Sequence, residues 1–223
     1  KSHARVVVIG GGVVGVSTLY HLTRKGWSDV VLLERTELTA GSTWHAAGLL
    51  PLFNMSYTVG QLHKYSVDLY KRLPAETGQD VSFHVTGNLR LATCRDRMDE
   101  YRKYCGTANT IGVPFQLISP AEVKELWPLV NLGGDADTPA VIGALYHPDD
   151  GHIAPADLTM ALRRAARSAG AEINEQTEVT GAVQMPSGEW KLTTNRGEIT
   201  AEHVVLCTGN YARQTGRMFG LKV

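Results

Sequence analysis

The chain has 223 residues, of which 43% are hydrophobic and 20% are charged, a balance typical of a protein that folds around a buried core. Lysine plus arginine number 22, as do aspartate plus glutamate, so the formal net charge is zero. A neutral chain offers no electrostatic attraction for nucleic acid. The long uncharged stretch that begins at Val6 contains four glycines and polar residues, too weak a pattern to span a bilayer. We therefore expect neither a nucleic-acid partner nor a membrane segment.

Only three cysteines occur, and none belongs to a CxxC pair, so the sequence predicts neither a disulfide framework nor a zinc ribbon. This composition favours a reducing compartment, either a bacterial cytoplasm or the mitochondrial matrix. The chain starts at Lys1 rather than at methionine, which is compatible with an upstream segment that has been removed.

The first elements predicted are a strand, a tight turn, a helix and a second strand. Residues 5–9 form a β-branched run typical of a buried strand in a parallel sheet, and residues 10–15 fit the G-x-G-x-x-G pattern. Apolar residues then recur at helical spacing as far as Gly26, the expected helix cap. Residues 29–33 predict a second buried strand that ends at Glu34. The order indicates a βαβ unit.

This unit has the features of a dinucleotide site. Gly10 allows the turn, Gly12 lets the backbone approach a pyrophosphate, and Gly15 lets the helix pack closely on the strand. The free amides and the positive end of the helix dipole favour the phosphates, while Glu34 can accept hydrogen bonds from ribose hydroxyls. The alternative is a glycine-rich turn in an unrelated α/β protein.

The next segment, residues 39–49 with the sequence TAGSTWHAAGL, consists of small and polar residues around one tryptophan and one histidine. It resembles the segment that runs beneath the flavin in FAD enzymes of the glycine oxidase, D-amino-acid oxidase and sarcosine oxidase superfamily. Its amino-acid sequence is similar to the signature of the dimethylglycine dehydrogenase and sarcosine dehydrogenase family. By this resemblance His45 carries a covalent bond to the flavin 8α-methyl, whereas a histidine satisfied within its loop is the alternative. Trp44 is expected either to shield the flavin or to lie in the core.

The glycine motif and the resemblance together predict a set of cofactor contacts, with FAD as the cofactor. The residues are Gly10, Gly12, Val14, Gly15, Glu34, Arg35, Ser42, Thr43, His45, Gly48, Leu49, Val179, Thr208 and Gly209. Arg90 and His152 are candidates for the substrate side, and no catalytic base is assigned. No metal site is predicted, because the crowded run 147–152 contains proline and Asp-Gly, which are turn formers.

The middle of the chain is expected to be an α+β insertion that forms part of a substrate or cap region, residues 56–150. Its predicted elements are a helix over 56–73, short strands over 83–85 and 89–92 joined at Gly87-Asn88, a helix over 95–109, a strand over 115–118, and a helix that starts with a capping box at Ser119. Residues 132–139 predict a flexible loop.

Residues 151–223 are expected to return to the FAD-binding domain that residues 1–55 begin. The predicted elements are a helix from Pro155 to its cap Gly170, a strand over 171–174, a three-stranded meander over 178–183, 190–194 and 198–200, and a separate buried strand over 203–209. The fold class is thus α/β, with a Rossmann-like FAD-binding domain, a β-meander and an α+β insertion.

The resemblance implies oxidation of a small N-methylated amino acid, dimethylglycine first and sarcosine second, with FAD accepting a hydride equivalent. The resulting iminium would yield formaldehyde or methylene-tetrahydrofolate, and an electron-transfer flavoprotein or oxygen would accept the electrons. The alternatives are a noncovalent FAD amine oxidase and a non-catalytic dinucleotide-binding fragment. Members of this family continue beyond the position of Val223 with the rest of the substrate region, the strand and glycine-containing segment that complete the FAD site, and a folate domain. The chain is therefore expected to be an N-terminal portion that is inactive by itself.

Overall fold

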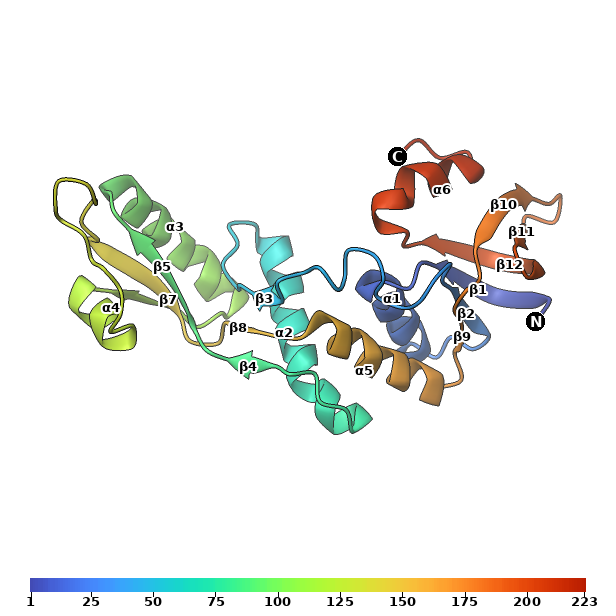
Figure 1. Ribbon diagram of the computed structural model, residues 1–223, viewed down its shortest axis with the longest axis horizontal. Coiled ribbons are helices and arrows are strands. Elements are labelled where there is room, and N and C mark those ends of the chain that lie inside the picture. Colours follow the sequence, from blue (N-terminus) through green and yellow to red (C-terminus); the bar gives the residue numbers. More distant parts are fainter. The chain divides into compact units, whose positions relative to one another are not determined.

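The computed structural model describes residues 1–223 and divides them into two compact units (Figure 1). Unit 1 comprises residues 1–47, 73–81 and 154–223, and unit 2 comprises residues 48–72 and 82–153. The segment 73–81, which the sequence analysis placed in the insertion, groups with unit 1. Residues 48–55 and 151–153, which it placed in the FAD-binding domain, group with unit 2. The assignment of an FAD-binding role to one part and a substrate role to the other stays a prediction.

Unit 1 is built on a six-stranded sheet with the order β10-β11-β12-β1-β2-β9. Strands β12, β1, β2 and β9 run parallel, and β10 and β11 extend the sheet antiparallel. Their bounds are β1 His3–Ile9, β2 Val30–Leu33, β9 Glu172–Asn174, β10 Val179–Gln184, β11 Trp190–Thr194 and β12 Gly197–Leu206. The expected α/β class with a parallel sheet is confirmed.

Two helices of unit 1, α1 (Val13–Arg24) and α5 (Pro155–Ser168), pack against each other. Leu19 of α1 and Leu162 of α5 are almost fully buried, as is Val7 at the centre of β1. Burying each such side chain stabilises the fold by about 1.5–3 kcal/mol. The position of α1 is therefore set by its apolar face, and this packing fixes its N-terminus at the carboxyl end of β1.

Strand β12 corrects the sequence analysis, which expected separate strands over 198–200 and 203–209. One continuous strand pairs antiparallel with β11 over residues 197–201 and, along its other edge, parallel with β1 over residues 200–206. Its sequence has no local signal that marks where either pairing begins or ends. The expectation of a buried strand is also wrong, because Val204 and Leu206 are only half-buried.

After β12 the chain forms a short 3₁₀ helix, η1 (Gly209–Tyr211), and then helix α6 (Ala212–Met218). The sequence analysis did not predict either of these elements. The expected cap of α1 is confirmed in position, since Gly26 follows the helix with a φ of 80°, a value that favours glycine.

Unit 2 contains two three-stranded sheets and three helical segments. The sheets have the orders β3-β8-β4 and β5-β7-β6. The strands are β3 Leu49–Leu50, β4 His84–Val85, β5 Asn88–Ala92, β6 Gln116–Ile118, β7 Gly143–His147 and β8 Gly151–His152. The helices are α3 Arg95–Ile111, α4 Pro120–Leu126 and the first part of α2, which spans Tyr57–Thr77.

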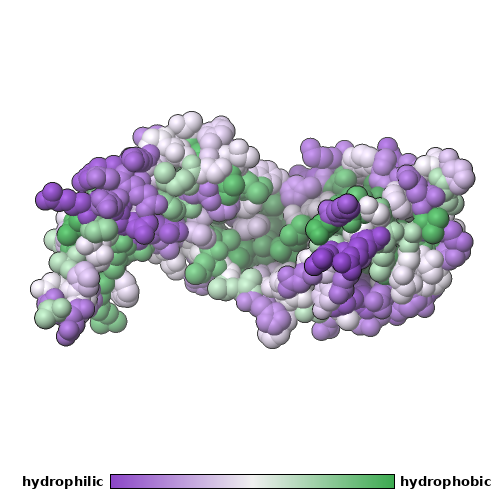
Figure 2. All heavy atoms as spheres, turned by 90° about the horizontal axis from the view of Figure 1, so that it is seen from above, coloured by the Kyte–Doolittle hydropathy of each residue, from purple (hydrophilic) through white to green (hydrophobic).

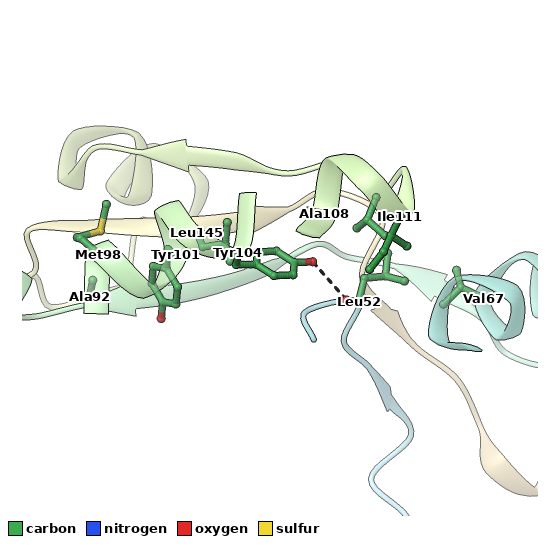
Figure 3. Packing of buried hydrophobic residues seen from close by; sticks show 10 residues of the cluster. Leu52, Val67, Ala92, Met98, Tyr101, Tyr104, Ala108, Ile111 and Leu145 are labelled. Atoms are coloured by element: carbon green, nitrogen blue, oxygen red, sulfur yellow. Dashed lines mark hydrogen bonds between the residues drawn. The ribbon is translucent and has the colours of Figure 1, made fainter. Parts of the chain in front are cut away.

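The main core of unit 2 lies between α3 and the β5-β7-β6 sheet (Figure 3). Tyr104 of α3 and Leu145 of β7 are fully buried there. The hydroxyl of Tyr104 donates a hydrogen bond to the carbonyl of Leu52. The outer face of α3 is charged, and Figure 2 shows it as a hydrophilic area at the left. This amphipathic division explains why α3 forms although its mean composition is polar.

The expected turn at Gly87-Asn88 does not join paired strands. Strand β4 pairs with β8, and β5 pairs with β7 in the other sheet. The backbone N–H groups of Thr86 and Gly87 both donate to the carbonyl of Asp150, at 3.1 and 2.8 Å. The link between β4 and β5 is therefore bonded to the β7–β8 turn, and the two strands diverge into separate sheets.

The capping box at Ser119 is confirmed. The Ser119 hydroxyl accepts a hydrogen bond from the backbone N–H of Glu122, and the Glu122 carboxylate accepts one from the backbone N–H of Ser119 at 2.7 Å. None of the helices combines the length and the apolar composition that a membrane crossing requires.

Candidate dinucleotide-binding site

The turn after β1 consists of glycines, so backbone without side chains lies at the start of α1. Gly10 has a φ of 115°, and its N–H donates to the carbonyl of Leu33 at 2.9 Å. A Cβ on Gly15 would lie 1.9 Å from the carbonyl oxygen of Gly10, so only glycine permits this close approach of helix and turn. Gly12 is the N-cap of α1 and supplies no capping side chain. The turn is thus shaped for an anion at the helix N-terminus.

Thr43 lies beside this turn. Its Oγ1 accepts a hydrogen bond from the backbone N–H of Val13 at 2.9 Å, and the residue is 8% exposed. The loop that follows β2 therefore caps the first amide of α1. Val14, the next residue of the helix, is 64% exposed, so the first turn stays accessible to a ligand.

Glu34, at the end of β2, connects the second strand to the turn. One carboxylate oxygen accepts from the N–H of Gly11 at 2.6 Å, and the other accepts from the N–H of Thr36 at 2.9 Å. The second oxygen also accepts from the hydroxyl of Thr36 at 3.2 Å, whereas the oxygen bonded to Gly11 keeps a lone-pair site that can accept from a ribose hydroxyl. The sequence analysis placed Glu34 here but missed Thr36, whose only signal is its position two residues after the acid.

The segment that precedes β10 runs along the same edge. The N–H of Thr177 donates to the carbonyl of Glu34 at 2.7 Å, and the N–H of Gln176 donates to the carbonyl of Thr36 at 2.8 Å. Val179, the first residue of β10, is buried. The structure thus brings the chain just before Val179 beside the end of β2.

The end of β12 lies against the glycine turn. A Cβ on Gly10 would meet the carbonyl oxygen of Cys207 at 2.4 Å, and Gly209 has a φ of 54°. The Oγ1 of Thr208 is buried without a hydrogen-bond partner, a condition that a bound polar ligand relieves. Two predicted contacts, Thr208 and Gly209, therefore lie with Gly10 at the carboxyl edge of the sheet.

Two contacts that the sequence analysis missed connect η1 to the segments after β2. The Nδ2 of Asn210 donates to the hydroxyl of Ser42 at 3.3 Å, and the guanidinium of Arg35 lies 3.9 Å from the centre of the Tyr211 ring. The only sequence signal for Tyr211 is an aromatic residue two positions after Gly209.

His45 lies on the exposed loop after β2. Its Nδ1 is 3.1 Å from the carbonyl oxygen of Gly41, and the ring of Trp44 stacks at a tilt with centroids 4.1 Å apart. Trp44 is 60% exposed, so the expectation that it belongs to the core is wrong. A shielding role for Trp44 stays a prediction.

The remaining predicted residues lie in unit 2. Leu49 pairs with His152 between β3 and β8, and the N–H of Ile153 donates to the carbonyl of Gly48 at 2.9 Å. Arg90 lies in the other sheet, on β5, with its guanidinium 4.5 Å from the centre of a phenylalanine ring. The structure therefore brings Leu49 and His152 together but places Arg90 in a different sheet.

Arg90 lies near three buried polar side chains, those of His147, Asp150 and Tyr104. His147 is fully buried, and burial together with the charge of Arg90 lowers its pKa to about 4. Asp150 is 1% exposed, and burial raises its pKa to about 6 although a hydrogen bond from Leu52 opposes the shift. Burial also raises the pKa of Tyr104 to about 12. Two members of the run 147–152 are thus directed inward, whereas His152 is exposed.

A parallel sheet with a glycine turn after its first strand and an acid after its second defines a dinucleotide-binding α/β fold. The family model described as FAD dependent oxidoreductase (DAO) matches residues 5–223, and the chain belongs to this family. FAD is the cofactor for which the family is named.

Similarity to known proteins extends over the whole chain. It is 43% identical over 221 residues to the mitochondrial dimethylglycine dehydrogenase of Rattus norvegicus, covering 99% of this chain and 25% of the relative. It is 40% identical over 231 residues to the mitochondrial sarcosine dehydrogenase of Homo sapiens, covering 100% and 24%. It is 35% identical over 215 residues to the mitochondrial pyruvate dehydrogenase phosphatase regulatory subunit of Mus musculus, covering 96% and 24%.

Among solved structures, the L-proline dehydrogenase of P. horikoshii matches with a TM-score of 0.90 and 31% identity, covering 100% of this chain and 57% of that protein. The chain spans about a quarter of the length of the curated relatives that it matches.

Proposed function

We propose that this chain is the FAD-binding part of an enzyme that oxidises a small N-methylated amino acid. Dimethylglycine is the first substrate candidate and sarcosine the second. The observation that carries the proposal is the convergence of the glycine turn, Glu34 and Thr43 at the start of α1, followed at once by the loop that contains His45.

The residues that would hold FAD follow from the geometry of unit 1. The start of α1, at Gly12 and Val14, would bind the pyrophosphate, and Glu34 would bind the ribose. The unpartnered hydroxyl of Thr208 would donate to a polar atom of the cofactor. Bound FAD supplies a two-electron acceptor for the hydride that leaves an N-methyl carbon of the substrate.

His45 is the proposed covalent anchor, and its contact with Gly41 favours Nε2 as the nucleophilic nitrogen. A carbonyl oxygen only accepts hydrogen bonds, so Nδ1 carries the proton in its contact with Gly41. In the neutral ring Nε2 then keeps its lone pair. The flavin 8α-methyl would therefore be attached at Nε2.

The proposed substrate preference rests on the sequence of the loop over residues 39–49 and on the identities to the two dehydrogenases. Ala40, Ser42 and Ala46 match the dimethylglycine dehydrogenase signature, and identity to the rat dimethylglycine enzyme is 43% against 40% for the human sarcosine enzyme. The oxidised substrate, an iminium, would hydrolyse to formaldehyde or pass its carbon to tetrahydrofolate. An electron-transfer flavoprotein or oxygen would accept the electrons, in the mitochondrial matrix or a bacterial cytoplasm.

The test is to precipitate the purified protein with acid and analyse its tryptic peptides by mass spectrometry. The peptide that contains Trp44 and His45 should carry the mass of FAD, and the His45→Ala variant should release its flavin on denaturation. Flavin that washes out of the unchanged protein would favour the noncovalent amine oxidase. Reduction of the flavin by dimethylglycine and by sarcosine, measured by absorbance, distinguishes the two substrates.

A second candidate is a non-catalytic regulatory module, favoured by the 35% identity to the phosphatase regulatory subunit. This candidate predicts that no small N-methylated amino acid reduces the flavin, or that the protein binds no flavin at all. Flavin reduction by either substrate would exclude it.

A further inference from the structure

The contact between Arg35 and Tyr211 crosses the glycine turn. Arg35 follows β2, and Tyr211 follows β12 by way of η1. The strand order places β1 between β12 and β2, and neighbouring strands are about 4.8 Å apart. A contact between the two outer strand ends must therefore pass over the end of β1, where the turn that begins at Gly10 meets α1.

A second contact follows the same path. Asn210 of η1 donates to Ser42, which belongs to the loop after β2. The neighbour of Ser42, Thr43, caps Val13 at the start of α1. Two side-chain contacts thus connect η1 to the residues after β2, and one of them carries a positive charge.

The charge of Arg35 has no acidic partner. Its guanidinium is exposed and forms no ion pair in the structure, while the face of the Tyr211 ring supports it at 3.9 Å. A cation–π contact of this kind is attractive and becomes stronger when water is excluded from it. Because guanidinium groups bind phosphate oxygens in pairs, this charge matches the pyrophosphate of a dinucleotide.

We propose that Arg35 and Tyr211 form a bridge over the glycine turn in which Tyr211 holds the Arg35 guanidinium against the pyrophosphate of bound FAD. The inference rests on the FAD site proposed above and adds Tyr211 to it as a positioning residue. In this arrangement α1 binds the phosphates from one side, and the Arg35 guanidinium binds them from the other.

The test measures FAD affinity by titrating the flavin-free protein and following flavin fluorescence. All variants are made in the His45→Ala background, so that FAD dissociates whether or not His45 is an anchor. The variants are Tyr211→Phe, Tyr211→Leu, Arg35→Met and the double variant Arg35→Met/Tyr211→Leu. Arg213→Met is the matched control, because it removes an exposed positive charge from the following helix α6.

Tyr211→Leu and Arg35→Met should each weaken FAD binding about 3- to 30-fold, and the double variant should be no weaker than Arg35→Met alone. Tyr211→Phe keeps the ring face and should bind within about twofold of its parent. Arg35→Met should also reduce the salt dependence of the affinity, which a purely structural defect would not change.

Unchanged affinity in Tyr211→Leu, additive losses in the double variant, or an equal loss in Arg213→Met would overturn the bridge. If Glu34→Ala weakens FAD binding while Tyr211→Leu does not, only the bridge fails. If none of the proteins binds FAD, the proposed site fails and the bridge fails with it.

Discussion

The carboxylate of Asp150 accepts a hydrogen bond from the backbone N–H of Leu52 at 2.9 Å, and both residues are buried. The carbonyl of the same leucine accepts from the hydroxyl of Tyr104 at 3.3 Å, which in turn contacts Nε2 of His147 at 3.0 Å. The backbone on both sides of Leu52, just after β3, is thus held by buried polar side chains. Its position depends on the protonation of two titratable side chains.

The first prediction concerns the pH dependence of stability. Folding raises the pKa of Asp150, so its contribution to the free energy of unfolding is present below pH 4 and is lost as the pH rises to about 6. Folding lowers the pKa of His147, so its contribution is present above pH 6.5 and is lost as the pH falls to about 4. The two contributions oppose each other between pH 4 and 6.5.

Asp150→Asn keeps an oxygen that can accept from Leu52 but removes the titration. Its free energy of unfolding should increase between pH 4 and pH 6.5. Over this range the change should exceed that of the unchanged protein by up to about 3 kcal/mol. Urea unfolding at several pH values measures this slope. Arg90 faces both groups in the unchanged protein and in the variant alike. Parallel pH profiles for the two proteins would contradict the prediction.

The second prediction concerns the close contact at Gly15. A Cβ there would meet the carbonyl oxygen of Gly10 at 1.9 Å, so Gly15→Ala should lower stability by about 3 kcal/mol and abolish FAD binding. Gly106→Ala, in α3, is the matched control, since a Cβ at Gly106 meets no atom within 4 Å. Thermal unfolding and flavin content measure both variants, and equal behaviour of the two would refute the steric argument.

The third prediction concerns the cap that Thr43 provides. Thr43→Val keeps the shape but leaves the N–H of Val13 without its acceptor, at a cost of about 1–2 kcal/mol in the free energy of unfolding. Thr43→Ser retains the hydroxyl and should lose less than half of that amount. Denaturant titration of the two variants gives the comparison, and a larger loss for serine than for valine would show that the methyl group matters instead.

The fourth prediction concerns Glu34. Its carboxylate is expected to bind the ribose of FAD, so Glu34→Ala in the His45→Ala background should weaken FAD affinity by about 1.5–3 kcal/mol for each hydrogen bond lost. Glu37→Ala removes a nearby exposed carboxylate and serves as the control. Fluorescence titration with FAD measures both. Equal affinities would remove Glu34 from the cofactor site.

The local elements could be predicted because their signals lie within a few residues. The strand, glycine turn and helix from Val6 to Gly26 follow from composition and spacing, and the box at Ser119 follows from a four-residue pattern. The position of Glu34 follows in the same way, since the acid directly ends a strand. Short-range sterics and hydrogen bonding decide these features, and both are encoded next to each other in the chain.

The pairing of distant segments could not be read in this way. Strand β12 pairs with β11 along one edge and with β1 along the other, and β4 pairs with β8 rather than with its neighbour β5. The burial of Asp150, the exposure of Trp44 and the contact of Arg35 with Tyr211 depend on which strands become neighbours. The sequence by itself determined the nucleotide-binding turn and its acid, because backbone conformation is local. Only the tertiary structure decided which side chains meet above that turn, because contacts between residues far apart in the chain depend on the packing of the whole sheet.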